Sequence, residues 1–265
     1  MQLTTQRIVM GISYDGSGYH GWQSQHGLLT VQSALEKAIG FVANEKIQIQ
    51  CAGRTDAGVH ASAQVIHFDT IADRNEHAWI YGATSNLPHD ISILWAKPVT
   101  DAFHARYSAR ARRYRYVIYN DPIRPAIIRN EVTWCNRPID EKKMAIAARH
   151  LIGEHDFSSF RGAGCQSAHA VRTIQQIHIS RRGRLVIVEI QANAFLMHMV
   201  RNIVGSLIQV GYGEREPEWI LEVLKAQDRR RAGVTMPPQG LYLVEVSYPP
   251  QFHLPQLPIG PFFLL

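Results

Sequence analysis

Residues 47–68 read IQIQCAGRTDAGVHASAQVIHF, and this stretch decides how the first part of the chain folds. Residues 47–51 and 64–68 have the β-branched and aromatic content of two strands. The loop of residues 53–60 between them brackets an arginine and an aspartate, Asp56, with two glycines. Glycine allows a sharp turn or the close approach of a ligand, and a loop held by a rigid strand often carries a reactive side chain. Asp56 is therefore a candidate for chemistry, although a tight turn in which it caps backbone amides has the same composition.

Outward from this loop, the chain alternates irregularly between strands and helices. Thr30 is expected to cap the first helix and Asp140 a later one. We expect strands at 8–14, 112–119, 174–180, 185–190 and 240–246, and helices at 31–42, 141–151, 195–210 and 217–226. Residues 181–184, Arg-Arg-Gly-Arg, are expected to form a hairpin turn between the strands at 174–180 and 185–190. Mixed elements without strict βαβ alternation indicate an α+β protein of two sheet-and-helix lobes that meet near residues 105–112. The expected lobes are residues 1–106, with the Asp56 loop, and residues 107–265.

Composition narrows the class of partner. The 265 residues carry a formal charge of +6, and arginines cluster at residues 106–115, 181–184 and 229–231. Clustered arginine with interleaved tyrosine is typical of a nucleic-acid surface, although each cluster alone is equally consistent with a solvated basic face. Three isolated cysteines exclude a disulfide framework and a CxxC zinc pair. Without a signal-peptide pattern or a long apolar run, we expect a soluble, cytoplasmic protein and no membrane association.

A second informative segment is FHARYSARARRYRY, residues 103–116. If its end is a strand, Arg112, Tyr114 and Tyr116 share one face and Arg113 lies on the other. One face would then offer an arginine beside a tyrosine to an RNA base, while the other meets phosphate or water. Ordinary sheet packing explains the tyrosines equally well.

The third segment is NAFLMHMVRNIVG, residues 193–205. On a helix, His198, Arg201 and Gly205 fall on one face among apolar neighbours. Because an unpaired buried charge is costly, Arg201 is expected to pair with a carboxylate. Asp56 is one candidate, and a structural pair with another acid is allowed by the same spacing.

Together these segments closely resemble the tRNA pseudouridine synthase A family. The matching stretches are SYDGSGYHGWQ, CAGRTDAGVHA, FHARYSARARRYRYVIYN, NAFLMHMVRNIVGSL and GLYLVEVSYP, in the order of the family, from Ile12 to Pro249. The resemblance implies an isomerase that converts uridine to pseudouridine at positions 38, 39 and 40 of the tRNA anticodon stem-loop. It implies that Asp56 is the catalytic aspartate, Tyr114 the active-site tyrosine and Arg201 the basic partner of the aspartate.

The resemblance also implies a way of binding the substrate. Arg54 would help to extrude the target base, and Leu243 would pack against the base or the catalytic loop. The full set of expected substrate-binding residues is Arg54, His60, Arg106, Arg110, Arg112, Arg113 and Leu243. The reaction needs neither cofactor nor metal, because it is redox-neutral and transfers no outside group. The family further implies one extended, mainly antiparallel sheet shared by the lobes, a catalytic cleft between them, and a homodimer that grips tRNA.

Two other functions remain open at this point. One is a non-catalytic RNA-binding module made of the same basic and aromatic parts. The other is a metal-dependent nuclease or hydrolase using Asp56, His60 and either Asp15 or His20. Gly58 between the first two weakens a helical ligand pair, so the metal alternative is the weaker one.

Overall fold

The computed structural model describes residues 5–264, which form two compact units. One unit contains the chain up to Arg112 together with the chain from Tyr242 onward, and the other contains Arg113–Leu241. We had expected lobes of residues 1–106 and 107–265. In the structure the first unit instead extends through Arg112 and also takes the C-terminal segment.

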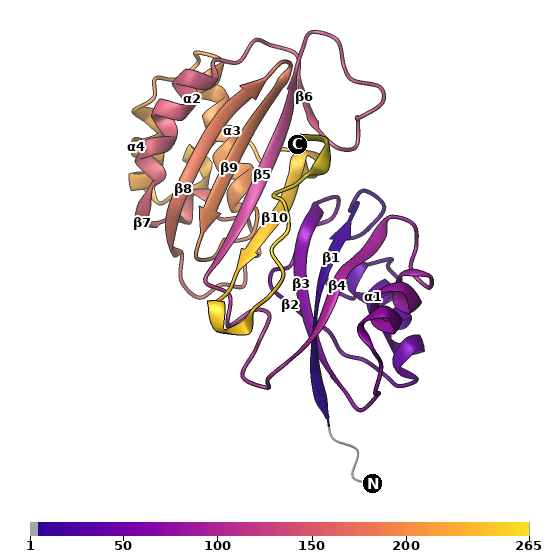
Figure 1. The fold of residues 1–265 in the computed structure, drawn as a ribbon. Coiled ribbons are helices and arrows are strands. Elements are labelled where there is room, and N and C mark those ends of the chain that lie inside the picture. Colours follow the sequence, from indigo (N-terminus) through magenta and orange to yellow (C-terminus); the bar gives the residue numbers. More distant parts are fainter. Residues whose placement is uncertain (1–4, 265) are drawn as a thin grey trace. The chain divides into compact units, whose positions relative to one another are not determined.

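The first unit is built on antiparallel strands (Figure 1). Its strands are β1 (Gln6–Tyr14), β2 (Gln50–Cys51), β3 (His60–Thr70), β4 (Ile91–Val99) and β10 (Leu241–Ser247). Strand β1 pairs antiparallel with both β3 and β4, and β2 pairs antiparallel with β3. Strand β10 runs parallel to β3, with Tyr242 opposite His60 and Leu243 opposite Ala61.

The helix of this unit, α1 (Val31–Ala43), begins where the sequence predicts. The Thr30 side chain accepts a hydrogen bond from the Ser33 amide, which satisfies one donor of the first turn. Leu35 and Ile39 recur at helical spacing and are buried.

The C-terminal segment joins the first unit by aromatic packing. Tyr248 and Phe252 both contact Phe103, with ring centroids 5.1 and 5.0 Å away, and the Tyr248 hydroxyl donates to the Ala105 carbonyl at 2.6 Å. These contacts are long-range in sequence, so the sequence pattern alone gave no sign of them.

The second unit is a sheet with helices on one face (Figure 1). Its strands are β5 (Ala111–Asn120), β6 (Thr133–Cys135), β7 (Gly153–Asp156), β8 (Val171–Arg182) and β9 (Leu185–Ala192), and its helices are α2 (Glu141–Ala148), α3 (Met199–Gly211) and α4 (Trp219–Ala226). The strand order is β5-β9-β8-β7, and β6 pairs with β5 in parallel. Strands β8 and β9 form the predicted hairpin, in which Gly183 has a φ of 58°.

The remaining elements are short. A π-helix covers Ala78–Gly82, and 3-10 turns cover Arg149–Leu151, Ser158–Phe160, Arg229–Arg231, Pro238–Gly240, Pro250–Phe252 and Phe262–Leu264. None of the helices within residues 5–264 has both the length and the apolar character of a membrane span. The pairing pattern confirms the α+β class with mainly antiparallel strands.

The structure differs from the predicted elements in several places. The strand expected at 47–51 is reduced to Gln50–Cys51, and no strand was predicted for β4, whose Pro98 argues against a strand. This proline is tolerated because β4 pairs only with β1 among the described strands, as an edge strand can. The helix expected at 195–210 begins only at Met199.

The cause of the late start is His198, which has a left-handed backbone with a φ of 60°. Its preceding carbonyl, on Met197, accepts a hydrogen bond from the Gly162 amide at 2.8 Å rather than from a helical neighbour. The prediction that His198 shares a helical face with Arg201 and Gly205 is therefore wrong, since His198 lies outside the helix.

Candidate active site

The loop that carries Asp56 is anchored at its first residue by a buried glutamine of β3. The Gln64 side chain donates to the Gly53 carbonyl at 2.6 Å and accepts from the Gly53 amide at 3.4 Å. On the preceding residue, the Ala52 carbonyl accepts from the Arg112 guanidinium, with Nη2 at 2.9 Å and Nε at 3.2 Å. These bonds satisfy backbone groups at the point where β2 ends, so the loop leaves the strand in a fixed direction.

Asp56 is the first residue of a tight turn. The Val59 amide donates to the Asp56 carbonyl at 3.1 Å, and Gly58 within the turn has a φ of 76°, a conformation that favours glycine. Thr55, just before the turn, is buried, and its hydroxyl lies 2.8 Å from the Tyr14 hydroxyl. The turn is thus fixed immediately on both sides of the aspartate.

Residues 15–22 pack directly on this turn. The Trp22 amide donates to the Thr55 carbonyl at 3.0 Å. A Cβ on Gly21 would lie 2.9 Å from the Thr55 carbonyl oxygen and 3.1 Å from the Asp56 carbonyl carbon, and a Cβ on Gly16 would lie 2.0 Å from the Val59 carbonyl oxygen. Glycine is required at both positions because the two backbones touch there.

His60 is part of this support. Its side chain is 2% exposed, stacks on Tyr242 with centroids 4.7 Å apart, and places Nδ1 3.0 Å from an Asp15 carboxylate oxygen and 3.1 Å from the Gly16 amide nitrogen. The hydrogen bond to His60 holds the pKa of Asp15 well below its usual range. His60 therefore ties residues 15–16 to β3.

The arginines of residues 106–112 fall into two groups. Arg112 points inward, since its guanidinium also donates to the carbonyls of Arg106 and Ala109. Arg106 and Arg110 are exposed. Arg106 lies over the ring of Tyr107, 5.6 Å from its centroid, and Tyr107 is 76% exposed.

Arg113 is also engaged within the protein. Its Nε donates to the Gln191 side chain at 2.9 Å, and its Nη1 lies 3.4 Å from Glu189. Arg115 on the same face contacts the same Glu189 carboxylate at 2.7 Å. Alternation along β5 thus directs both arginines at acceptors on the adjacent strand β9, an arrangement that explains them as sheet contacts.

Tyr114, on the opposite face of β5 from Arg113, packs edge-to-face on Phe195, with ring centroids 5.0 Å apart. The next residue on that face, Tyr116, donates its hydroxyl to the Pro237 carbonyl at 2.7 Å. Burial raises the pKa of Tyr116 above its usual value.

Arg201 is held by the segment that precedes β10. Its Nε donates to the Met236 carbonyl at 2.6 Å, and the Met236 amide donates back to the Arg201 carbonyl at 3.3 Å. The neighbouring Asn202 is fully buried and accepts from the Arg229 guanidinium and the Thr235 hydroxyl. Residues 229–236 therefore fix both the helix and the plane of the Arg201 guanidinium.

The sequence-predicted residues divide between the two units. The first unit holds Arg54, Asp56, His60, Arg106, Arg110, Arg112 and Leu243, and the second holds Arg113, Tyr114 and Arg201. Arg54 is exposed, whereas Leu243 is fully buried beside Ala61, immediately after the loop. The supporting roles of Gln64, Gly21 and Met236 were not predicted, because they depend on which backbone groups the fold brings to them.

Comparison with known proteins identifies the family to which the chain that carries these residues belongs. The family model described as tRNA pseudouridine synthase matches residues 10–108 and 147–249. The tRNA pseudouridine synthase A of Coxiella burnetii strain Dugway 5J108-111 is 66% identical over 258 residues, which cover 97% of this chain and 99% of the relative. This chain belongs to the tRNA pseudouridine synthase family.

Other members of the family named tRNA pseudouridine synthase A are similarly complete matches. The Shewanella loihica protein is 55% identical over 98% of this chain and 99% of its own length, and the Vibrio parahaemolyticus protein is 54% identical over 97% and 98%. Asp56 and Arg201 fall inside the ranges that the family model matches, whereas Tyr114 lies between them. The archaeal box H/ACA sRNP Nop10-Cbf5 complex is a distant structural match, with a TM-score of 0.41 and 10% identity over 90% of this chain and 47% of that chain.

Proposed function

We propose that this member of the tRNA pseudouridine synthase family isomerises uridine in the anticodon stem-loop of tRNA, with Asp56 as its catalytic carboxylate. The observation that carries the proposal is the 66% identity to a tRNA pseudouridine synthase A across nearly the whole of both chains. The bonds that hold the turn around Asp56 support its role, because catalysis requires the reacting group to be held to within a fraction of an ångström.

The reaction suits a carboxylate without a cofactor. The N1–C1′ bond of uridine breaks, the uracil turns, and a C5–C1′ bond forms, while the C5 proton leaves to solvent and N1 takes up a proton. No electrons are gained or lost overall. An ionised Asp56 can attack the sugar carbon as a nucleophile or remove a ribose proton as a base, and the same residue serves both routes.

Arg201 is proposed as the partner of Asp56. A guanidinium within about 4–6 Å favours the ionised carboxylate even where water is excluded. The bond from Nε to the Met236 carbonyl, at 2.6 Å, holds the Arg201 side chain. Tyr114 is proposed to contact the target base, and its edge-to-face packing on Phe195 limits how its ring can turn.

The target base must leave its stack, which costs a few kcal/mol. Arg54, exposed two residues before Asp56, is proposed to assist this step. Exposed Arg106 and Arg110 are proposed to hold phosphates, with Tyr107 beside them. The expectation that Arg112 and Arg113 also contact phosphate is replaced by a structural role in this proposal, because their guanidinium groups are bonded within the protein. We further propose that the protein acts as a homodimer.

The substrate is tested by mapping the product. An unmodified tRNA transcript is incubated with the protein, treated with a carbodiimide that marks pseudouridine, and read by primer extension. New stops confined to the anticodon arm are expected, and modification elsewhere or none at all contradicts the proposed substrate.

The Asp56–Arg201 pairing is tested separately by Arg201→Gln. The rate of pseudouridine formation should fall, because Asp56 loses its proposed partner. Arg215→Gln is the control, since Arg215 is an exposed arginine of the same unit that lies over the Trp219 ring. A rate for Arg201→Gln equal to that of the wild type contradicts the pairing.

A further inference from the structure

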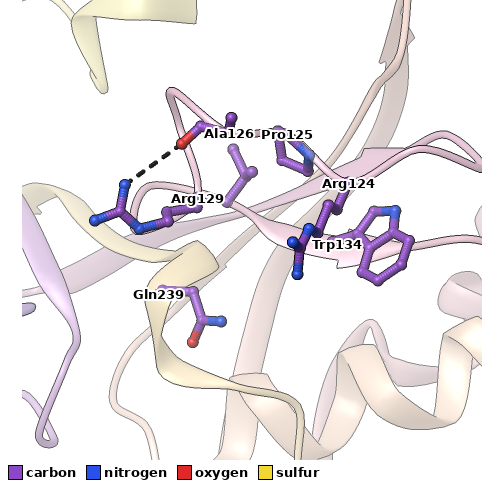
Figure 2. Close-up of a pocket in the computed structure, with 7 residues that line it drawn as sticks. Arg124, Pro125, Ala126, Arg129, Trp134 and Gln239 are labelled. Atoms are coloured by element: carbon purple, nitrogen blue, oxygen red, sulfur yellow. Dashed lines mark hydrogen bonds between the residues drawn. The ribbon is translucent and has the colours of Figure 1, made fainter.

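A pocket of about 450 Å³ lies in the second unit beside the connection from β5 to β6 (Figure 2). Its volume falls in the range of known small-ligand sites. The side chains that matter for recognition are Arg124, Arg129, Trp134 and Gln239, and none of the residues that line the pocket is acidic. None of these residues has a role in the catalytic proposal.

Trp134 provides the pocket with a fixed aromatic surface. It is the middle residue of β6, so its neighbours Thr133 and Cys135 are buried while its own side chain is 41% exposed. Its indole Nε1 donates to the Asp121 carbonyl at 2.7 Å. Because the polar edge of the indole is already bonded, the exposed part is ring surface, which is the kind of platform on which an unpaired base stacks.

The charge around the ring is positive. Arg124 is exposed, and its side chain makes no hydrogen bond or ion pair with any residue in the described range 5–264. Arg129 turns away from Trp134 toward the Ala126 carbonyl, at 3.5 Å (Figure 2). The nearby Asp121 carboxylate is paired with Arg184 at 2.9 Å, so it does not neutralise Arg124.

From this arrangement we infer that the pocket binds one unpaired nucleotide of the tRNA, with the base stacked on Trp134 and a phosphate at Arg124. The inference rests on the proposed function, because that function makes tRNA the substrate of this protein. Gln239 also lines the pocket. Phosphate contacts hold RNA in register, and a stacked base adds affinity with little dependence on its identity.

The pocket is built on the same segment that orients Arg201. The Met236 carbonyl accepts from Arg201, the Pro237 carbonyl accepts from Tyr116, and Gln239 lines the pocket. Gly240 then packs so closely that a Cβ there would lie 2.7 Å from the Val117 carbonyl oxygen. A nucleotide in the pocket would therefore contact a rigid segment whose other end holds a proposed catalytic side chain.

A second copy of the chain is the competing occupant. Ile123 and Ile127 on the same connection are 76% and 93% exposed in the single chain, and exposed apolar side chains of this kind are typical of a surface that contacts another protein. Neither isoleucine lines the pocket, whereas two arginines and an exposed indole do. RNA is favoured because the residues facing the pocket are those that bind a nucleotide.

The test compares Trp134→Leu, Trp134→Phe and Arg124→Gln with the wild type in filter binding of tRNA over a range of salt. Trp134→Leu should weaken binding about tenfold or more, whereas Trp134→Phe should retain most of the affinity because it keeps a stacking ring. Both variants remove the indole bond to Asp121, so a purely structural role would affect them equally. Arg124→Gln should lower the salt dependence by about one released ion. The matched control is Arg215→Gln, at an exposed arginine of the same unit that lies over the Trp219 ring, and it should change neither quantity.

Crosslinking locates the contact directly. Irradiated tRNA that contains 4-thiouridine should attach to the peptide containing Trp134. The inference is overturned if no crosslink reaches this peptide, or if Trp134→Leu and Trp134→Phe bind tRNA alike. It is also overturned if Ile127→Ser and Trp134→Leu lower the native mass of the protein while tRNA affinity stays the same, because the pocket would then be a contact between two copies of the chain. Pseudouridine formation by the wild type is measured alongside: its absence contradicts the proposed function, whereas its presence with an unaltered Kd in Trp134→Leu contradicts only the pocket.

Discussion

Gly21→Ala should slow the reaction by moving the backbone of the catalytic loop. Gly21 has a φ of 85°, and an added Cβ would meet the Thr55 carbonyl oxygen at 2.9 Å, the Ala57 amide nitrogen at 3.0 Å and the Asp56 carbonyl carbon at 3.1 Å. Ordinary Cβ contacts begin near 3.4 Å. The turn must therefore shift by about 0.5 Å, and since a 1 Å misplacement can cost about a hundredfold, we expect about a tenfold lower rate.

Gly27→Ala supplies the matched control on the same connection. Gly27 has a φ of 75°, but an added Cβ would meet nothing within 4 Å. Both variants incur the left-handed backbone cost of about 1–2 kcal/mol, which corresponds to a Tm loss of several degrees. Only Gly21→Ala also displaces the turn, so the difference between the two variants isolates that displacement.

The assay is single-turnover tritium release from tRNA labelled at uracil C5, with enzyme in excess, combined with thermal unfolding of each variant. We expect a loss of Tm in both variants, larger for Gly21→Ala because of its added backbone contacts, and a rate loss confined to Gly21→Ala. The reasoning is refuted if Gly21→Ala reacts at the wild-type rate, or if Gly27→Ala is slowed to the same extent.

Two further predictions concern RNA binding and pH. Arg106→Ala should weaken tRNA binding and reduce its salt dependence. Arg113→Ala should leave the salt dependence of binding unchanged and lower the free energy of unfolding by about 1 kcal/mol or more, because a bond to Glu189 is lost. A reduced salt dependence in Arg113→Ala would contradict its structural role. Burial lowers the pKa of His67 to about 4, and its Nδ1 accepts from the Ala105 amide at 3.1 Å. The unfolded chain therefore binds the proton more readily, so stability should fall as pH drops from about 6.5 toward 4, and His67→Leu should flatten that part of a denaturation–pH profile; an unchanged profile would show that His67 does not contribute.

Features fixed by local sequence were predicted correctly. Thr30 and Asp140 cap their helices, and Gly183 turns the β8–β9 hairpin, because each of these depends on residues a few positions apart. The helix ahead of Met199 was predicted wrongly, since a bond from Gly162, 35 positions away from Met197, competes with helical pairing. Local periodicity contains no information on such a partner.

In the candidate site, too, the features set by local sequence were predicted and those set by distant contacts were not. The glycines around Asp56 indicated a loop that could hold a reactive side chain, and that loop is present. Alternation along β5 correctly separated Tyr114 from Arg113, but it did not reveal that Arg113 meets Glu189 and Gln191 on β9. Which strand lies beside β5 is set by the tertiary fold, so the sequence left the basic cluster open to two interpretations, an RNA surface or a solvated face.

The central claim is tested most directly by tritium release with Asp56→Asn. The substitution keeps the size of the side chain and removes its charge, and Asp73→Asn is the control because Asp73 is an exposed aspartate of the same unit. The account predicts release by the wild type and Asp73→Asn, none by Asp56→Asn, and tRNA binding by all three. Release by Asp56→Asn at a rate comparable to the wild type would contradict it.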